Sequence, residues 1–484
     1  MLSSYKQRET LDRVIGFRGY VALGFGVMVG VGWVVYAGQW IEAGGVGGAI
    51  LAFLLGALLL WPVGRCYAEL TSALPLSGGE MAFTYKAFGS FWSFLAAWGL
   101  SLNYIAVTPF ETIAMGMMTE AILPSIRTET LYEIGGYRIA WSTIIPGILA
   151  AVWVTWLNWK GAKASVLFQT FATVLMLLSS IIFLCVALSR GSPENLAPLF
   201  AGEGSFWTIV PASIAAVLVV VPFFLTGFDC IPQAAEESGV KMAPRQIGLA
   251  ILSTIALGAT FYSLILLALG YSVPGTILDE ILTESEALPM AKVFRESFGY
   301  DWAARLVLFA ALLGILSTLN GIFMAATRLL FAQGRGGLLP HWFAELHPVH
   351  HTPKNAVLVV GAIALIGPFL GKAALLLIVN CYSLVFSLII IATSLTLLQL
   401  RKTAPELERP YNAGRLSGPA SLLVGVFLVL LMAVPGSPGF LGPEEFMTVA
   451  VWMAFGAALY AIRQRIERLS DEEQAYMILG VRSR

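Results

Sequence analysis

The chain has 484 residues, of which 58% are hydrophobic and 12% are charged, and its mean hydropathy is +0.80. Soluble domains carry about 25% charged residues, so this composition excludes an ordinary soluble protein and indicates a polytopic membrane protein. The formal net charge is +0, which removes the electrostatic basis for a nucleic-acid partner.

Apolar windows of about 20 residues, the length that crosses a lipid bilayer as a helix, mark twelve spans in chain order. The expected spans are 17–42, 46–68, 91–122, 139–158, 164–188, 206–234, 247–270, 302–332, 355–371, 374–400, 418–435 and 445–462. The predicted fold class is therefore an all-α polytopic membrane protein. Because no linker divides the spans, we expect one transmembrane domain over residues 1–484.

The basic residues are distributed unequally between the two sides of the predicted bundle. With the N-terminus inside, most of them fall on the inner side, and the outer side receives only Arg127, Arg138, Arg190, Lys292, Arg295, Arg305 and Lys372. The positive-inside rule then predicts an integral protein of the plasma (inner) membrane with both termini cytoplasmic. Segments 1–16 and 463–484 would be its cytoplasmic ends.

Two of the predicted spans are interrupted by glycine. The first contains Gly30-Val31-Gly32-Trp33, and the sixth contains Pro-Phe-Phe-Leu-Thr-Gly-Phe-Asp at 222–229. An unpaired backbone group in hydrocarbon costs several kcal/mol, so a break there indicates backbone that lines a cavity or binds a ligand. If the chain consists of two five-span halves, the breaks are equivalent and predict a midplane substrate site of a secondary transporter. The alternative for Gly-Val-Gly is a small-residue packing face.

The polarity of the broken backbone predicts what binds there. The half-helix beyond Trp33 begins at the break, so free N–H groups of Val31, Gly32 and Trp33 would receive a carboxylate. Carbonyl groups near Met28 and Phe224 would suit an ammonium group. The predicted substrate-binding set is Val27, Met28, Gly30, Val31, Gly32, Trp33, Phe223, Phe224, Leu225, Gly227 and Phe228.

Aromatic and ionisable side chains lie beside these breaks. Trp33, Phe223, Phe224 and Phe228 are candidates for a wall that closes over the ligand, against the alternative of ordinary packing. Asp229 caps the inner half-helix in one interpretation and handles a substrate amine or a proton in the other. Glu111, in the third span, either hydrogen-bonds the broken sixth span or titrates as a proton-coupling group.

Several short motifs occur in order along the chain. They are Tyr67-Ala-Glu-Leu to Gly79 with Ala87-Phe-Gly, the sixth-span segment 224–229 with Ala235-Glu-Glu, Leu316-Ser-Thr-Leu-Asn with Arg328, and Pro405-Glu-Leu-Glu-Arg-Pro-Tyr411. Together, over about residues 15–415, they resemble the amino acid-polyamine-organocation (APC) superfamily. Any one of these motifs alone is weak evidence.

The resemblance implies a 5+5 inverted repeat, in which residues 17–190 and 206–400 interlock and the helices of 418–462 are peripheral. It also implies a gating aromatic at Phe223. The expected function is a secondary active transporter that moves a small amino acid by alternating access, not an enzyme, and it uses no cofactor. A carboxylate-free amine such as ethanolamine or a polyamine is the alternative substrate. The oligomeric state is left open.

The coupling ion has three alternatives at this stage: sodium, a proton, or substrate exchange. Some proton-coupled members of the superfamily carry a lysine fifteen residues after the glycine equivalent to Gly161; here that position is Met176, which cannot titrate. Ser317 and Thr318 of the eighth span, with first-span carbonyls, would offer hard oxygen ligands to sodium. They would equally bond to their own helix.

Two other protein classes remain as weaker alternatives. His341, His347, His350 and His351 with Glu345 suggest a membrane metalloenzyme, although their spacing matches no HExxH motif. A transport-inactive sensor is the other class, although both ends of the chain are short. We also expect either a helical lid or an ordinary loop at 271–301.

Overall fold

The computed structural model describes residues 8–273, 301–466 and 469–480. The apolar helices are α1 Phe17–Met28, α2 Gly32–Val35, α3 Ala37–Ala73, α5 Ser90–Ile122, α6 Trp141–Trp159, α7 Ala162–Arg190, α8 Phe206–Leu218, α9 Val221–Phe224, α10 Cys230–Gln233, α11 Pro244–Ser272, α14 Asp301–Arg335, α15 Lys354–Leu370, α16 Ala373–Thr403, α17 Ser417–Ala433 and α18 Pro443–Ile466. The connecting elements are α4 Glu80–Phe88, α19 Asp471–Leu479, β1 Thr130–Ile134, β2 Tyr137–Ala140 and the short 3-10 turns η1 Pro124–Ile126, η2 Pro193–Leu196, η3 Ala235–Glu237 and η4 His341–Ala344.

The helices confirm the all-α polytopic class. Within the described residues, nine helical segments are long and apolar enough to cross a membrane, and the first of them is 17–35, counted across its break. Three shorter apolar helices, α8, α15 and α17, bring this to the twelve spans predicted from hydropathy. The wide hydrocarbon core requires about 20 apolar residues per helix, which is why this property is readable from sequence.

The boundary between the first two spans lies at Gly45. Helix α3 contains the C-terminal end of the first span and the whole second span, and Gly45 between them has a non-helical φ of 68°. A Cβ at this position would lie 2.5 Å from the carbonyl oxygen of Leu199. Glycine therefore permits both the left-handed backbone and the close approach of the loop at 199.

Two connecting elements were not predicted. A hairpin of β1 and β2 precedes α6, and its turn uses Gly135 and Gly136, with φ of 59° and 78°. Ile139 and Ala140 complete β2, so the predicted fourth span begins two residues too early, and α6 begins at Trp141. Helix α4 connects the second and third spans. The predicted lid at 271–301 lies almost wholly outside the described residues.

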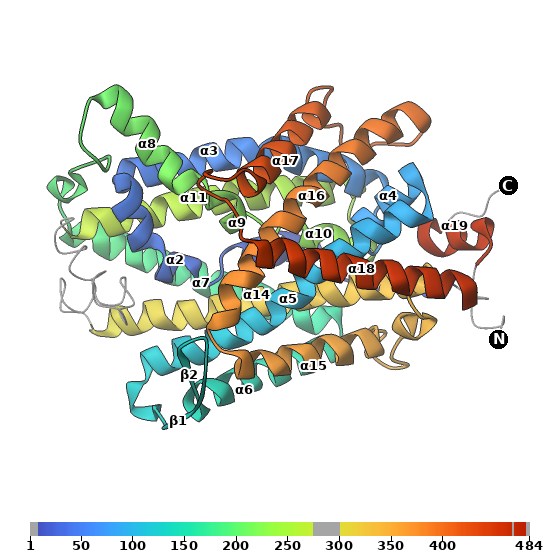
Figure 1. The fold of residues 1–484 in the computed structure, drawn as a ribbon, viewed down its shortest axis with the longest axis horizontal. Coiled ribbons are helices and arrows are strands. Elements are labelled where there is room, and N and C mark those ends of the chain that lie inside the picture. The colour runs from blue at the N-terminus through green and yellow to red at the C-terminus, as the bar shows by residue number, and fades with distance from the viewer. Residues whose placement is uncertain (1–7, 274–300, 467–468, 481–484) are drawn as a thin grey trace.

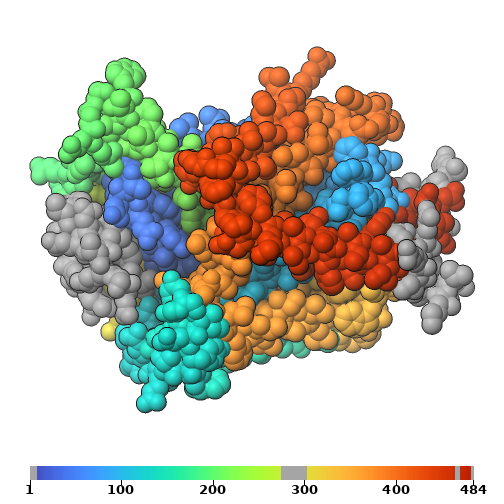
Figure 2. All heavy atoms as spheres, in the orientation of Figure 1, coloured from blue at the N-terminus to red at the C-terminus, as the bar shows by residue number. Residues whose placement is uncertain are grey.

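The long helices pack in a layered bundle (Figure 1). Helices α3 and α11 run side by side on one side of the bundle, α6 and α15 on the other, and α5 and α14 lie between them. Helix α1 is inside, in contact with α7, α11 and α14. Figure 2 shows α18 lying across the outside of the bundle, where Met447, Val451 and Phe455 are exposed to the lipid region. The expected peripheral position of the last helices agrees with this arrangement.

Buried ion pairs gather at the end of the bundle that carries both termini, which we call the termini end (Figure 1). Arg328 of α14 makes two 3.0 Å hydrogen bonds to the carboxylate of Glu237, and both side chains are almost fully buried. The carboxylate of Glu236 forms ion pairs with the guanidinium groups of Arg335 and Arg8, with N–O distances of 2.7 and 3.2 Å. Burial opposes the charge of Glu236, but the two arginines outweigh it and lower its pKa to about 2. Glu236 is therefore charged throughout the neutral range.

We expect Arg328→Met to destabilise the protein by about 3–5 kcal/mol, because it leaves the carboxylate of Glu237 buried without its partner. Thermal unfolding in detergent measures the effect. The matched control is Lys354→Met, which breaks a 3.0 Å pair with Glu345 that is partly exposed and should cost less than about 1 kcal/mol. Equal losses in the two variants would contradict a structural role of the buried pair.

Candidate functional site

The two predicted breaks are present and lie against each other. Helix α1 ends at Met28 and α2 begins at Gly32, while α9 ends at Phe224 and α10 begins at Cys230. Gly227 has a φ of 111°, and a Cβ there would lie 2.8 Å from the backbone nitrogen of Met28. The close contact between the breaks therefore requires a glycine in the sixth span.

The first break leaves a run of backbone donors unpaired. The N–H groups of Val34 and Val35 donate to the carbonyl of Val31, so the new helix is hydrogen-bonded from there on. The four N–H groups of Gly30, Val31, Gly32 and Trp33 find no acceptor in the described part of the chain. They stand at the start of the half-helix that continues into α3, where the positive end of the helix dipole favours an anion.

The second break leaves carbonyl groups unpaired. In the described chain, no N–H or hydroxyl donates to the carbonyls of Phe224, Leu225 or Thr226. The carbonyls at the end of α1 are partly paired: Met28 accepts the hydroxyl of Tyr262 at 3.0 Å. The two breaks thus offer N–H donors on one segment and carbonyl acceptors on the other.

Aromatic rings pack around the breaks. A Cβ on Gly32 would lie 2.6 Å from the ring of Phe224, so this ring covers the donor segment. Phe223 packs edge-on against Tyr382 of α16, with ring centroids 5.7 Å apart, and so connects the sixth span to the tenth. The gating role that the resemblance implies for Phe223 stays a prediction.

The other aromatic candidates are packed deeper. Trp33 is fully buried and meets Phe261 of α11 edge-on, with centroids 5.7 Å apart. Phe228 is also fully buried, and its ring meets Tyr67 at 5.5 Å. Both positions match the packing alternative that the sequence left open. The aliphatic candidates Val27 and Leu225 are buried in the core as well.

Asp229 does not cap the inner half-helix, because its side chain accepts no hydrogen bond from the first turn of α10. The carboxylate turns back instead and accepts the N–H of Gly227 at 2.8 Å and the hydroxyl of Tyr104 at 3.0 Å. The residue is fully buried. Asp229 therefore stabilises the broken segment and fixes it to α5, and the capping interpretation is wrong.

Glu111 lies on the same face of α5 as Tyr104, seven residues further along the helix. It is 4% exposed, and one oxygen of its carboxyl group has no hydrogen-bond partner in the described chain. No hydrogen bond joins it to the described backbone of the sixth span, which was one of its two expected roles. Its position in the membrane interior leaves the coupling role as a prediction.

The coupling candidates Met176 on α7 and Ser317 and Thr318 on α14 are also buried. Thr318 donates its hydroxyl to the carbonyls of Gly26 and Val27 at 3.3 and 3.2 Å. Ser317 accepts the amide of Gln169 at 2.7 Å. Met176 is fully buried on α7.

Three residues near the breaks were missed by the sequence reasoning: Tyr104, Tyr262 and Gln169. Each is a buried polar group in an apolar span, and polar residues inside a membrane are default functional candidates. Tyr104 also precedes Glu111 by two helical turns, a spacing that places both on one face. The sequence therefore carried a signal for the positions but not for their partners.

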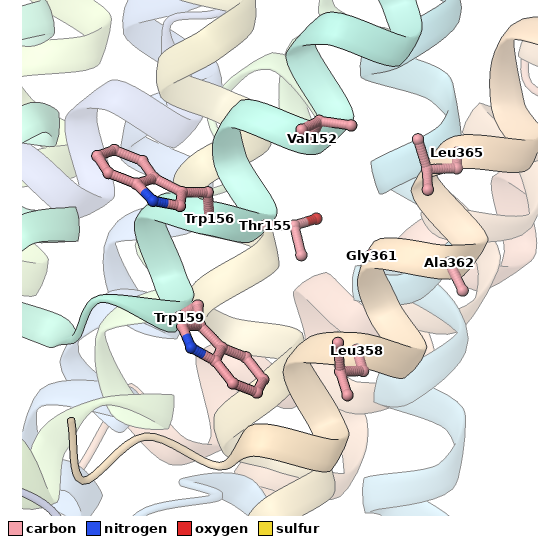
Figure 3. A pocket seen from close by; sticks show the side chains of 8 residues that line it. All are labelled: Val152, Thr155, Trp156, Trp159, Leu358, Gly361, Ala362 and Leu365. Carbon is pink, nitrogen blue, oxygen red and sulfur yellow. The ribbon is translucent and has the colours of Figure 1, made fainter. Parts of the chain in front are cut away.

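A groove of about 470 Å³ lies on the outside of the bundle between α6 and α15 (Figure 3). Its lining residues are Val152, Thr155, Trp156, Trp159, Leu358, Gly361, Ala362 and Leu365. The lining is apolar and carries no charge, so it suits the lipid surroundings and lacks the groups that would bind a zwitterion. Among the described residues, no group of three or more His, Cys, Asp or Glu is placed to hold a metal ion.

Comparison with known proteins gives the chain its relatives. Residues 15–457 match the model of the amino acid permease family. The chain is 26% identical to the methylthioribose transporter of Bacillus subtilis, with 97% of each chain covered, and 25% identical to the branched-chain amino acid permease BcaP of the same organism, with 96% of each covered. It is 28% identical to mouse cationic amino acid transporter 4, over 84% of this chain and 62% of that protein.

The family match extends over nearly the whole chain and agrees with the twelve spans and the two broken helices. Its relatives are membrane transporters and not enzymes. The chain belongs to the amino acid permease family of the APC superfamily and is an integral membrane transporter.

Proposed function

We propose that this transporter carries a small amino acid by alternating access and holds it on the unwound backbone of the two breaks. The carboxylate docks on the free N–H groups of Gly30 to Trp33, and the ammonium group docks on the free carbonyls of Phe224 to Thr226. The observation that carries this proposal is a run of four N–H groups beside three carbonyls, none of which has a partner among the described residues. Unpaired groups in the membrane interior are stabilised only when a ligand or water completes them.

The pairing of Asp229 favours a zwitterion over a bare amine. An amine brings no carboxylate of its own, and each oxygen of Asp229, the carboxylate within the second break, already accepts a hydrogen bond, from Gly227 or from Tyr104. Nothing in an amine would satisfy the N–H groups of the first break. Two relatives, the branched-chain permease and the cationic transporter, carry amino acids by name, and a third is named for methylthioribose.

Phe223 is the gate in this proposal. Its ring contacts Tyr382 of α16, and it would have to swing away for the substrate to pass. The proposed orientation has the termini end, with its buried ion pairs, facing the cytoplasm of a plasma or inner membrane. The excess of basic residues assigned to that side supports this orientation.

A comparison of amino acids with their own decarboxylated amines tests the substrate class. Leucine, alanine and arginine are compared with isoamylamine, ethylamine and agmatine, and methylthioribose is included as a neutral competitor. We expect at least one amino acid to raise the unfolding temperature of the detergent-purified protein, since a ligand of the folded state stabilises it. Its amine should require at least about tenfold higher concentration.

Equal or better stabilisation by an amine or by methylthioribose would contradict the carboxylate docking. Uptake of the stabilising amino acid into proteoliposomes then separates a transporter from a sensor. Binding without accumulation or exchange would contradict the transport mechanism.

Gly32→Ala should weaken binding of the stabilising amino acid at least about tenfold, because the added methyl would lie 2.6 Å from the ring of Phe224 and crowd the donor segment. The matched control is Gly99→Ala in α5, where the nearest side-chain atom would be 3.6 Å away. Binding is measured by titration of the unfolding temperature. Unchanged affinity in the Gly32 variant would refute docking at this backbone.

Asp229→Asn should keep most of the binding affinity, because the amide oxygen still accepts the N–H of Gly227. Asp229→Ala removes both acceptors and should destabilise the protein by about 1–3 kcal/mol while it weakens binding. Thermal unfolding with and without ligand measures both effects. If the Asn variant fails as badly as the Ala variant, the charge and not the acceptor is what the site requires.

A further inference from the structure

The side chain of Gln169 contacts Ser317, one of the two hydroxyl residues that the sequence assigned to sodium. Its amide nitrogen donates to the hydroxyl oxygen of Ser317 at 2.7 Å and to the carbonyl oxygen of Ala22 in α1 at 3.4 Å. Thr173, one turn further along α7, donates to the same carbonyl at 3.3 Å. A Cβ on Gly26 would collide with the side chains of Gln169, Ser317 and Thr173, so all three pack closely against one turn of α1.

The orientation of the Gln169 amide is fixed by a chain of neighbours. The amide nitrogen of Asn158 in α6 donates to the backbone carbonyl of Val154 at 3.1 Å, and a carbonyl only accepts. The same nitrogen donates to the side-chain oxygen of Asn320 at 3.0 Å, and the nitrogen of Asn320 donates to the side-chain oxygen of Gln169 at 2.7 Å. The remaining Gln169 nitrogen therefore faces Ser317 and Ala22 as a donor.

This arrangement has consequences for a cation. A sodium ion needs several oxygen acceptors directed at one point, and an N–H group directed at that point repels it. Here the hydroxyl of Ser317 and the carbonyl of Ala22 already accept from the amide. Thr318 uses its hydroxyl as a donor to Gly26 and Val27. All of these side chains are at least nine-tenths buried.

We propose that the carboxamide of Gln169 permanently occupies the place of a coupling cation and joins α7, α14 and α1 through neutral hydrogen bonds. Conformational change at this junction then needs neither sodium nor a proton. Gln169 is a positioning residue, since it acts on the broken first span through Ala22 and not on the substrate. The inference rests on the proposed function only where transport is measured; the ion-binding part is independent of it.

The first test needs no substrate. The unfolding temperature of the purified wild-type protein is measured in sodium chloride and in choline chloride at equal ionic strength. We expect the same temperature in both salts. A sodium-specific rise in the wild-type protein would overturn the proposal, whatever the transport assays show.

The second test converts the site. In Gln169→Glu, a protonated carboxyl group reproduces the donor of the amide, whereas the ionised form directs an oxygen at Ser317 and Ala22 and needs a cation. At mildly alkaline pH we expect a sodium-specific rise in unfolding temperature in this variant. Where uptake is established, we expect it to fall about tenfold in choline and to return with sodium or at lower pH.

Two further variants interpret the outcome. Ser179→Ala removes a buried hydroxyl of the same helix that donates to the carbonyl of Leu175, one turn earlier in α7, and it should show no sodium response. If Gln169→Glu does not fold, Gln169→Met is used, which removes the donor at similar size; uptake should fall about tenfold in both salts. A folded Glu variant indistinguishable from wild type in both salts and at both pH values would overturn the proposal, as would unchanged uptake in the Met variant.

Discussion

Backbone groups without partners in the interior of a membrane are the constraint on which this structure depends. Two helices stop and restart next to each other, and Gly227 of one break approaches the backbone of Met28 in the other. Each N–H or carbonyl group without a hydrogen-bond partner there carries a free-energy cost of several kcal/mol. That cost is the reason for proposing that the two breaks bind a small zwitterion.

The surrounding helices pair most of the loose groups and leave two sets free. The hydroxyl of Tyr262 donates to the carbonyl of Met28, and that of Thr318 donates to the carbonyls of Gly26 and Val27. The carboxylate of Asp229 accepts the N–H of Gly227. Within the described part of the chain, a run of donors remains at the first break and a run of acceptors at the second. Side chains from α11, from α14 and from the second break itself thus determine which backbone groups stay unpaired.

The spans, the breaks and the family were predictable from sequence because each depends on local signals. A long apolar run must cross the membrane as a helix, and a Gly-Val-Gly or Thr-Gly-Phe interruption at its centre is visible without any partner. The division of the chain into repeat segments and the docking roles of the named residues stay predictions of the same kind.

The partners of polar side chains were not predictable. Asp229 fitted the pattern of an N-cap, yet it bonds to Gly227 before it and to Tyr104 on another helix. Ser317 and Thr318 fitted a sodium site, but Gln169 of α7 directs its amide at one of them. The last two residues of β2, Ile139 and Ala140, were predicted as the start of the fourth span. Each of these depends on contacts between segments far apart in the sequence, which periodicity does not encode.

A structure of the protein with its stabilising amino acid bound tests the central claim most directly. The account predicts that the carboxylate oxygens lie about 2.7–3.2 Å from backbone nitrogens of the Gly30 to Trp33 segment, with the ammonium group on the carbonyls after Phe224. A ligand whose carboxylate is held only by side chains, or that lies in the groove between α6 and α15, would contradict it.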